Sequence, residues 1–593
     1  MSNQTSFNPT ENNENLDNSI NLEKPHTSCL ICNENLTSSS LYRRLRVCPS
    51  CRYHYSITAR RKIAMVAEKG TFKEINKWVE SNDPLKFSPK LSYKKRIAQD
   101  QVRTKLNEAV ITGTCRVGGS NIVLVVLDSG FMGGSMGLVV GEKVSLALEY
   151  AAKKNIPAVA LVTSAGKRIQ EGILSLTQMA KTVIAAKKIK DKKIPFLVHL
   201  GNPCTGQVLS SFASMGDIIL AEPQAHVGLS SLGELREIEG KHIDSEHVSE
   251  TYFKHGHIDK IVERPQLKNQ ITTLLDLISP SFTLERKKEP TTKKIPVLQK
   301  DPWETVKLAR RGDRPDSKFY ITQIFSDFIE LHGDRISGDD DSVILGVGRI
   351  EGQSAIVAAQ QKTVTSPETY DPLRAGQITP EGFRKAQRGA KMAETFGLPF
   401  ITLIDTAGPK LGIAMEYKGI AGAIASMINQ LSTIKTRTIS VIIGEGGSEA
   451  ALAFGISDRV LMMENAIYTQ ISPELGARTE MNETQGTYDI AGALKLTSFD
   501  CLDMGIIDGI INEPTGGAHL HPTESARLLK MILIDEISEL NQKNNYTNIK
   551  RRYKKFRNIG DYNNKRGTAL KNEISVWRKG ISVGLKSFRE SKD

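Results

Sequence analysis

Four cysteines carry the clearest chemical pattern in this sequence. Cys29 and Cys32 are separated by two residues, and after fifteen further residues Cys48 and Cys51 repeat that spacing. Two such pairs offer four thiolates to one tetrahedral metal ion, as in a zinc ribbon. The alternative is two unrelated redox or core pairs, but the segment between them is polar and favours a metal that holds it together. We therefore expect one structural Zn²⁺ on these four cysteines.

The other three cysteines, Cys115, Cys204 and Cys501, are isolated in the sequence. Residues 1–21 are rich in Asn, Ser and Glu and have neither a basic flank nor an apolar stretch typical of a secretory signal. No run of about 18 uncharged apolar residues predicts a membrane span. We therefore expect a cytoplasmic protein with reduced cysteines and no disulfide.

Two glycine-containing turns suggest oxyanion binding. In residues 163–168 and again in residues 444–452, an apolar strand ends in small residues and runs into a helix. Small residues let a substrate approach the backbone, and the start of a helix leaves peptide N–H groups unpaired. No HExxH motif or paired Cys and His that would supply a nucleophile stands out, nor does a dinucleotide or P-loop motif. This combination favours enolate chemistry.

The elements that must position these turns repeat along the chain. Residues 121–127 and 157–163 read as buried strands with an amphipathic helix between them, which predicts an α/β layered domain. The segment starting at Pro157 matches the one starting at Pro399, and Asp217 and Asp259 match Asp458 and Asp508 in the same order. Because three matches keep nearly the same offset of about 240–250 residues, a duplicated fold is indicated.

The length and the charge of the chain limit the class of protein and its possible partners. The chain has 593 residues, of which 39% are hydrophobic and 24% charged, so it is a multidomain globular protein and not a fibrous or disordered one. Its formal net charge is +13, concentrated in residues 43–62, 285–300 and 550–592. Such a balance suits nucleic acid, an acidic partner or a phosphate-bearing substrate such as a coenzyme A ester. The simpler interpretation is that these runs are solvated faces, with the C-terminal one a partly helical appendage.

Several longer motifs resemble a known enzyme family. Residues 48–51, 131–137, 140–143 and 168–176 are similar to the β subunit of bacterial acetyl-CoA carboxylase carboxyltransferase. Residues 306–310, 330–335, 380–385, 443–448, 471–474 and 513–519 are similar to its α subunit. The resemblance spans about residues 29–519, so the chain resembles a β–α fusion.

The resemblance implies two crotonase-like domains of the ClpP/crotonase superfamily in tandem, with an N-terminal zinc ribbon. The implied boundaries are a disordered terminus (1–26), the ribbon (27–55), the β-type domain (56–280), a linker (281–300), the α-type domain (301–540) and a basic tail (541–593). The implied oxyanion donors are the backbone N–H groups of Ala165, Gly166, Ala450 and Ala451. The implied substrate contacts are Gly133, Gly134, Arg168, Gly206, Gly408, Gly446 and Gly447.

The family's reaction moves a carboxyl group from carboxybiotin on a carrier protein to acetyl-CoA, giving malonyl-CoA for fatty acid or polyketide synthesis. The implied partners are a biotin carboxyl carrier protein and an ATP-dependent biotin carboxylase, since this chain lacks a Met-Lys-Met biotinylation motif. A homodimer with sites formed between facing halves is also implied. Departures from the family's pattern lie where the chemistry is expected, at Ala165, Gln207 and Glu449.

Two alternatives remain open at this point. One is a specialised isoform with altered acyl-CoA specificity or inhibitor resistance in a secondary-metabolite pathway. The other is a catalytically weak homologue that binds nucleic acid through the ribbon, which is less favoured because few aromatic residues accompany the charge. The basic residues near the ribbon are Arg43, Arg44, Arg46, Arg52, Arg60, Arg61 and Lys62.

Overall fold

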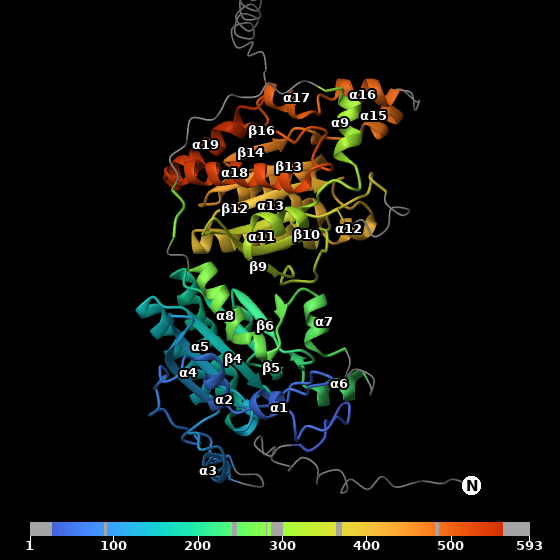
Figure 1. The fold of residues 1–593 in the computed structure, drawn as a ribbon. Coiled ribbons are helices and arrows are strands. Elements are labelled where there is room, and N and C mark those ends of the chain that lie inside the picture. Colours follow the sequence, from blue (N-terminus) through green and yellow to red (C-terminus); the bar gives the residue numbers. More distant parts are fainter. Residues whose placement is uncertain are drawn as a thin grey trace, which may run out of the picture.

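The computed structural model describes residues 26–87, 92–239, 246–279, 282–285, 300–362, 371–480 and 486–560. Two bodies are stacked along the long axis of the molecule (Figure 1). The first half holds the ribbon and one sheet, and the second half holds the other sheet. The expected disordered N-terminus, most of the expected linker and most of the expected tail lie outside the described residues.

The first half contains an eight-stranded sheet in the order β1-β2-β3-β4-β5-β6-β8, with β7 beside β5. Its strands are β1 (Lys73–Ile75), β2 (Val110–Val117), β3 (Ser120–Leu127), β4 (Ala158–Ser164), β5 (Phe196–Thr205), β6 (Ile218–Ala221), β7 (Val227–Gly228) and β8 (Lys260–Ile261). Its α-helices are α1 (Ser40–Leu45), α2 (Ala59–Val66), α3 (Tyr93–Thr104), α4 (Leu138–Lys154), α5 (Gly172–Asp191), α6 (Leu232–Glu239), α7 (Ser249–Lys254) and α8 (Arg264–Ile278).

The second half repeats this arrangement in the order β16-β14-β13-β12-β11-β10-β9, with β15 beside β13. Its strands are β9 (Ser326–Leu331), β10 (Val343–Ile350), β11 (Gln353–Gln360), β12 (Phe400–Thr406), β13 (Thr438–Gly447), β14 (Arg459–Met463), β15 (Ile467–Thr469) and β16 (Gly509–Ile511). Its helices are α9 (Pro302–Ala309), α10 (Ser317–Ile324), α11 (Pro380–Phe396), α12 (Ile413–Tyr417), α13 (Ile420–Thr433), α14 (Ser448–Gly455), α15 (Pro473–Glu480), α16 (Thr487–Ala493), α17 (Ser498–Asp503), α18 (Pro522–Asn541) and α19 (Asn545–Arg557).

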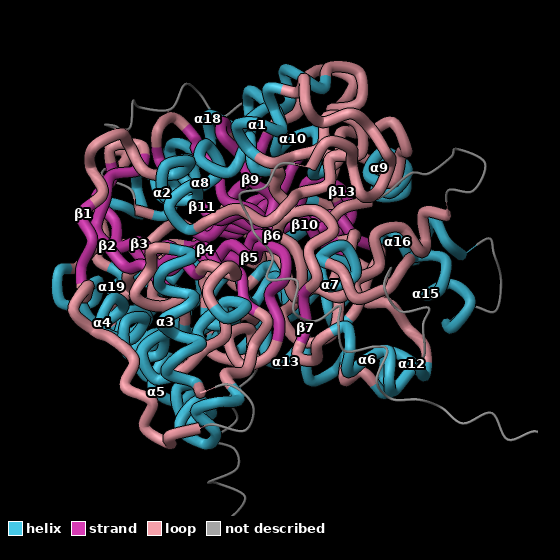
Figure 2. Tube along the Cα trace, turned by 90° about the horizontal axis from the view of Figure 1, so that it is seen from below, coloured by secondary structure: helices cyan, strands magenta, loops and turns pink. Residues whose placement is uncertain are grey.

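The strand order confirms the predicted duplication, because β1 to β8 correspond one by one to β9 to β16. In both halves the first three strands are antiparallel neighbours and the following strands are parallel. Every residue of β4 and of β12 is buried, as expected for central parallel strands with helices on both faces. Figure 2 shows the strands gathered in the middle with helices around them.

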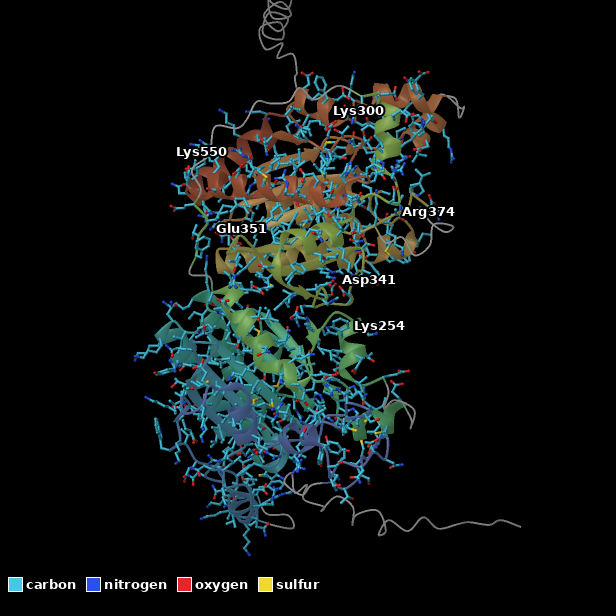
Figure 3. All side chains as sticks on the ribbon, in the orientation of Figure 1. Lys254, Lys300, Asp341, Glu351, Arg374 and Lys550 are labelled. Carbon is cyan, nitrogen blue, oxygen red and sulfur yellow. The ribbon has the colours of Figure 1, made fainter. Side chains whose placement is uncertain are left out.

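A set of ionic contacts joins the two halves. Asp259, just before β8, pairs with Arg335 and, at 2.8 Å, with Arg388 of the second half. The Arg335 N–H donates to the Gly256 carbonyl at 3.0 Å. Lys254 and Asp341 lie on the two sides of this boundary (Figure 3). The second half therefore covers the β8 end of the first sheet.

The expected boundary between the second body and its tail requires a correction. Helix α19 lies beyond residue 540, yet it packs on the second half through Arg552, which is 1% exposed. The Arg552 guanidinium donates to both carboxylate oxygens of Asp458 at 2.9 Å and to the Leu431 and Thr436 carbonyls. Lys550, on the exposed face of α19, lies at the outer side of the second half (Figure 3). The second body thus extends at least to α19.

Membrane insertion has no support from the helices. Among the described residues, none of them combines the length and the apolar character that a bilayer crossing requires.

Candidate active site and metal centre

The four cysteines converge at one point, as the sequence predicts for a zinc ribbon. All four Sγ atoms lie within 4.8 Å of one another, with Cys29–Cys51 at 3.6 Å and Cys32–Cys48 at 3.7 Å. Tetrahedral zinc with Zn–S bonds of about 2.3 Å requires S–S separations of about 3.8 Å. The thiol set therefore fits Zn²⁺ in ligand type, number and spacing.

An aromatic cluster supports this centre. Tyr55 lies edge-on to Tyr42 and Tyr53, with ring centroids 5.4 and 5.0 Å apart. The Tyr55 hydroxyl is 3.2 Å from Cys29 Sγ and accepts the Leu30 N–H at 2.9 Å. These three tyrosines supply most of the ribbon's small core, since the segment is otherwise polar.

A sharp turn ends the longest parallel strand in each half. Strand β5 ends at Thr205, and Gly206 turns the chain with φ 66°. Strand β13 ends at Gly447, and Ser448 turns the chain with φ 54° into α14. We call these turns the first and second elbow. They hold equivalent places, because Cys204 pairs with Ser164 on β4 as Gly446 pairs with Thr406 on β12.

Backbone N–H groups directly after each elbow are free. In the described part of the chain, the Gln207 and Val208 N–H groups have no hydrogen-bond acceptor, while the Gly206 N–H donates to the Gly228 carbonyl at 2.9 Å. In α14, Glu449 and Ala450 occupy the second and third positions, whose N–H groups have no partner inside a helix. Each elbow can therefore accept an oxyanion.

Comparisons with known proteins identify the fold and the family. A family described as acetyl co-enzyme A carboxylase carboxyltransferase-like matches residues 257–560. The beta/alpha carboxyl transferase subunits of acetyl-coenzyme A carboxylase from Clostridium tetani are 36% identical over 92% of this chain and 96% of the relative. The chain belongs to the acetyl-CoA carboxylase carboxyltransferase family.

A further relative matches less than half of this carboxyltransferase chain, and a solved structure matches most of it. The alpha subunit from Treponema denticola is 44% identical over 44% of the chain and 85% of the relative. A transcarboxylase 12S hexamer, solved with methylmalonyl-coenzyme A and methylmalonic acid, has a TM-score of 0.65 at 18% identity, covering 82% of this chain and 90% of that chain. The latter likeness confirms the tandem fold.

The family's motifs predict that Ala165 and Gly166 are oxyanion donors, and this prediction is wrong. The Ala165 N–H donates to the Gly133 carbonyl at 2.8 Å, and the Gly166 N–H donates to Ser164 Oγ at 3.0 Å. The second half repeats this, since the Gly408 N–H donates to Thr406 Oγ1 at 3.0 Å. Both N–H groups of the turn after β4 already have acceptors within the first half, so they are unavailable to a substrate.

The elbow of the second half corrects one more expected donor. Ala450 lies at the third position of α14, as an oxyanion donor requires, but Ala451 lies at the fourth. A fourth-position N–H bonds back to the carbonyl of the residue before the helix, here Gly447. Ala451 is therefore not a free donor.

The predicted pocket glycines lie at close backbone contacts. A Cβ on Gly206 would lie 2.9 Å from Gly166 Cα, so these two glycines let the β4 turn touch the first elbow. In the second half, a Cβ on Gly447 would lie 2.4 Å from the Ala407 carbonyl oxygen. Gly133 and Gly134 lie between β3 and α4, Gly408 follows β12, and Gly446 lies near the end of β13; added Cβ atoms there would be 2.3–3.7 Å from their neighbours. Their substrate contact stays a prediction.

Arg168 is not available to a substrate, which corrects its predicted role. Its side chain is fully buried and pairs with Glu108 at 2.8 Å. Its Nη1 also lies 3.0 Å from the Tyr93 hydroxyl, and its Nε donates to Ser135 Oγ at 2.7 Å. Glu108 outweighs the effect of burial and raises the pKa of Arg168, so the charge is permanent. Arg168 holds the loop between β3 and α4.

The side chains of the two substituted elbow residues each have a polar partner. The buried Gln207 amide lies 3.0 Å from Ser175 Oγ on α5. Glu449 is exposed and accepts the Ser448 hydroxyl, without an ion pair to Lys410 within the described ranges. Because an exposed carboxylate is screened by water, it opposes a nearby oxyanion only weakly.

Two cavities beside the second half's strand ends were not predicted. One of 610 Å³ runs from Ser448 and Glu449 along mostly apolar residues to Phe556 and Ile559. The other, of 400 Å³, is polar and reaches Lys362. Lys362 Nζ lies 2.8 Å from Asp405 and 3.4 Å from Glu445, at the ends of β11, β12 and β13. Spacing alone gave no signal for this group, since its members lie on three separate strands.

Proposed function

We propose that this chain is the carboxyltransferase component of an acetyl-CoA carboxylase, forming malonyl-CoA from acetyl-CoA and carboxybiotin in the cytoplasm. The observation that carries this proposal is the pair of equivalent elbows in a chain similar over nine-tenths of its length to beta/alpha carboxyl transferases. The first elbow binds the acetyl thioester, and the second elbow binds carboxybiotin. A biotin carboxyl carrier protein presents the carboxybiotin, and a biotin carboxylase regenerates it.

The chain contributes oriented N–H groups and not a nucleophile. The Gln207 and Val208 N–H groups bind the enolate oxygen of the acetyl thioester, and the Glu449 and Ala450 N–H groups bind the ureido oxygen of carboxybiotin. Preorganised donors of this kind stabilise charge that develops during the reaction, typically by about 2.7–4 kcal/mol per donor. The ureido nitrogen takes the methyl proton once CO₂ has left, so no protein base is required.

The two elbows act across a dimer interface in this proposal. Exposed apolar side chains lie three residues after the β4 and β12 turns, at Ile169 and Leu411, which are 70% and 75% exposed. Ile173 and Ile413 extend these two patches. Because such patches mark interaction sites and a two-fold dimer pairs unlike halves, a second copy covers both. Each site then joins a first elbow to the second elbow of the partner.

Zinc has a structural role in this scheme. Cys29, Cys32, Cys48 and Cys51 hold one Zn²⁺ and leave no open coordination position, which is typical of structural sites. The ion stabilises the ribbon fold and takes no part in carboxyl transfer.

The test is malonyl-CoA formation by the purified full-length chain, measured by mass spectrometry. The expected result is product that requires both acetyl-CoA and the carboxylated carrier protein. Parallel reactions with propionyl-CoA and longer acyl-CoA esters report substrate preference and so address a specialised isoform. A folded, zinc-loaded dimer that forms no carboxylated product from any of these esters would overturn the proposal.

A further inference from the structure

One buried arginine fastens the ribbon to the first half. Arg264, at the start of α8, is 3% exposed and donates from Nε and Nη2 to the two carboxylate oxygens of Glu222 at 2.6 and 2.8 Å. Its Nη1 donates to the ribbon carbonyls of Tyr55 at 2.6 Å and Leu45 at 2.9 Å. Arg264 therefore ties together α8, the end of β6 and the ribbon.

On the ribbon side, these contacts lead to the metal ligands. Tyr55 offers its carbonyl to Arg264, its N–H to the Arg46 carbonyl at 2.9 Å, and its hydroxyl to Cys29 Sγ. Cys48 and Cys51 lie in the hairpin between Arg46 and Tyr55, closed by the bridge between Val47 and His54. Both cysteine pairs are thus held through one residue whose backbone Arg264 fixes.

On the sheet side, the ribbon touches the strand that carries the first elbow. Asn202, four residues before Gly206 on β5, donates from Nδ2 to the Tyr53 hydroxyl at 3.4 Å. The Ser56 hydroxyl donates to the Asn202 carbonyl at 3.4 Å. Moving the ribbon would therefore disturb β5 close to the free N–H groups of Gln207 and Val208.

A second ionic contact of the ribbon, between Arg52 and Glu263, is weaker. Arg52 pairs with Glu263, but its side chain is 40% exposed, and exposed pairs contribute little. The Arg264–Glu222 pair is buried, and its charges have no access to water if they separate. The position of the ribbon thus depends mainly on Arg264.

We propose that Arg264 is a positioning residue that couples metal binding in the ribbon to the first elbow. Without its side chain the ribbon loses its carbonyl anchors, zinc leaves faster, and β5 loosens before Gly206. The last step, an effect on turnover, rests on the proposed carboxyltransferase function, whereas zinc release and backbone protection do not.

The second half supplies a matched control. Arg314 is buried, pairs with Glu513 and donates from Nε to the Ile443 carbonyl at 2.9 Å. Glu513 and Arg264 follow equivalent strand ends, β16 and β8. Removing Arg314 therefore breaks a buried ion pair of the same kind without touching the ribbon.

The experiment compares full-length wild type, Arg264→Met and Arg314→Met. Zinc transfer to a chromogenic chelator is timed, and hydrogen exchange is followed in peptides spanning residues 196–210. We expect zinc release about tenfold faster in Arg264→Met than in either other protein, as for other outer contacts of metal ligands. Faster exchange at residues 196–210 and a lower kcat with KM for acetyl-CoA nearly unchanged should accompany it.

Equal zinc release in the two variants, or faster release with unaltered exchange at residues 196–210, would overturn the proposal. If Arg264→Met does not fold, Tyr55→Phe removes only the hydroxyl next to Cys29 and should still accelerate release, and an unchanged rate there would also count against the coupling. A wild type without carboxyl transfer would refute the proposed function but leave the zinc and exchange results interpretable.

Discussion

The two halves share one fold but cover its outer edge differently. In the first half, Asp217 and Asp259 accept the Phe196 and Ile219 N–H groups, and in the second half Asp458 and Asp508 accept the equivalent Thr438 and Val460 N–H groups. In the first half, cations of the second half pair with Asp259, whereas Asp217 pairs with Lys190 of its own half. In the second half, α19 lies over the equivalent carboxylates instead.

The cations that meet these carboxylates show the difference. Arg335 and Arg388 of the second half form ion pairs with Asp259. In the second half, Arg552 and Lys555 of α19 form ion pairs with Asp458 and Asp508, respectively. A duplicated domain therefore repeats these acids, and Asp259 in one copy and Asp458 in the other take their cations from different neighbouring segments. The helix that resembles a solvated basic tail in the sequence is, on one face, the cap of the second copy.

The largest difference between the halves concerns the ribbon, which only the first half has. Cys48→Ser should remove one of four zinc ligands and unfold the ribbon, because structural zinc contributes on the order of 10 kcal/mol to folding. We expect about one Zn per chain in wild type by metal analysis and clearly less in the variant. Proteolysis should then cut within residues 27–55, while the second half stays resistant. A zinc content near zero in fresh wild type would contradict this.

The second-largest effect is expected at α19, the helix that covers the second half. Arg552→Met should leave Asp458 buried without its charge partner and cost about 3–5 kcal/mol. Thermal unfolding measures this. The control is Arg551→Met on the exposed face of the same helix, with an expected change within about 0.5 kcal/mol. Equal melting temperatures for the two variants would show that α19 is an appendage after all.

The residue that turns the chain differs between the elbows, because it is Gly206 in the first and Ser448 in the second. Gly206→Ala should strain the φ of 66° and press on Gly166, a cost of about 1–3 kcal/mol that lowers kcat by moving the Gln207 and Val208 N–H groups. Ser448→Gly relieves a φ of 54° and should keep activity. Steady-state carboxyl transfer by both variants decides this. A loss of activity in Ser448→Gly as large as that in Gly206→Ala would contradict this strain argument.

The smallest expected effect is a difference in stability between variants at two equivalent acids, Asp217 and Asp458. Burial raises the pKa of Asp217 to about 6, only partly opposed by Lys190 at 4.0 Å. A carboxyl whose folded-state pKa is raised binds its proton more tightly when folded, so its contribution to stability falls as pH rises from about 4 through 6. Asp217→Asn should therefore flatten this part of the pH profile and be neutral or about 1 kcal/mol stabilising at pH 8. Asp458→Asn should instead destabilise, because Arg552 loses its charge partner.

Local patterns determined much of this protein. The spacing of four cysteines predicts the metal centre, since a ribbon's ligands lie close together in sequence. Runs such as residues 121–127 and 157–163 predict buried strands, and their repetition predicts two copies of one fold. The family motifs predict Ala450 in the second elbow, but in the first half they place the oxyanion donors in the turn after β4 and not at the first elbow.

Only the tertiary structure decided which groups are free and which are paired. Ala165 and Gly166 lie in a turn of the expected composition, yet their N–H groups are used by Gly133 and Ser164. The partners of Arg168, Arg264 and Arg552 lie 60, 42 and 94 residues away and follow no periodic pattern. A donor or a charge is available to a substrate only if folding leaves it without a closer partner. That condition depends on distances in space, which spacing along the chain does not contain.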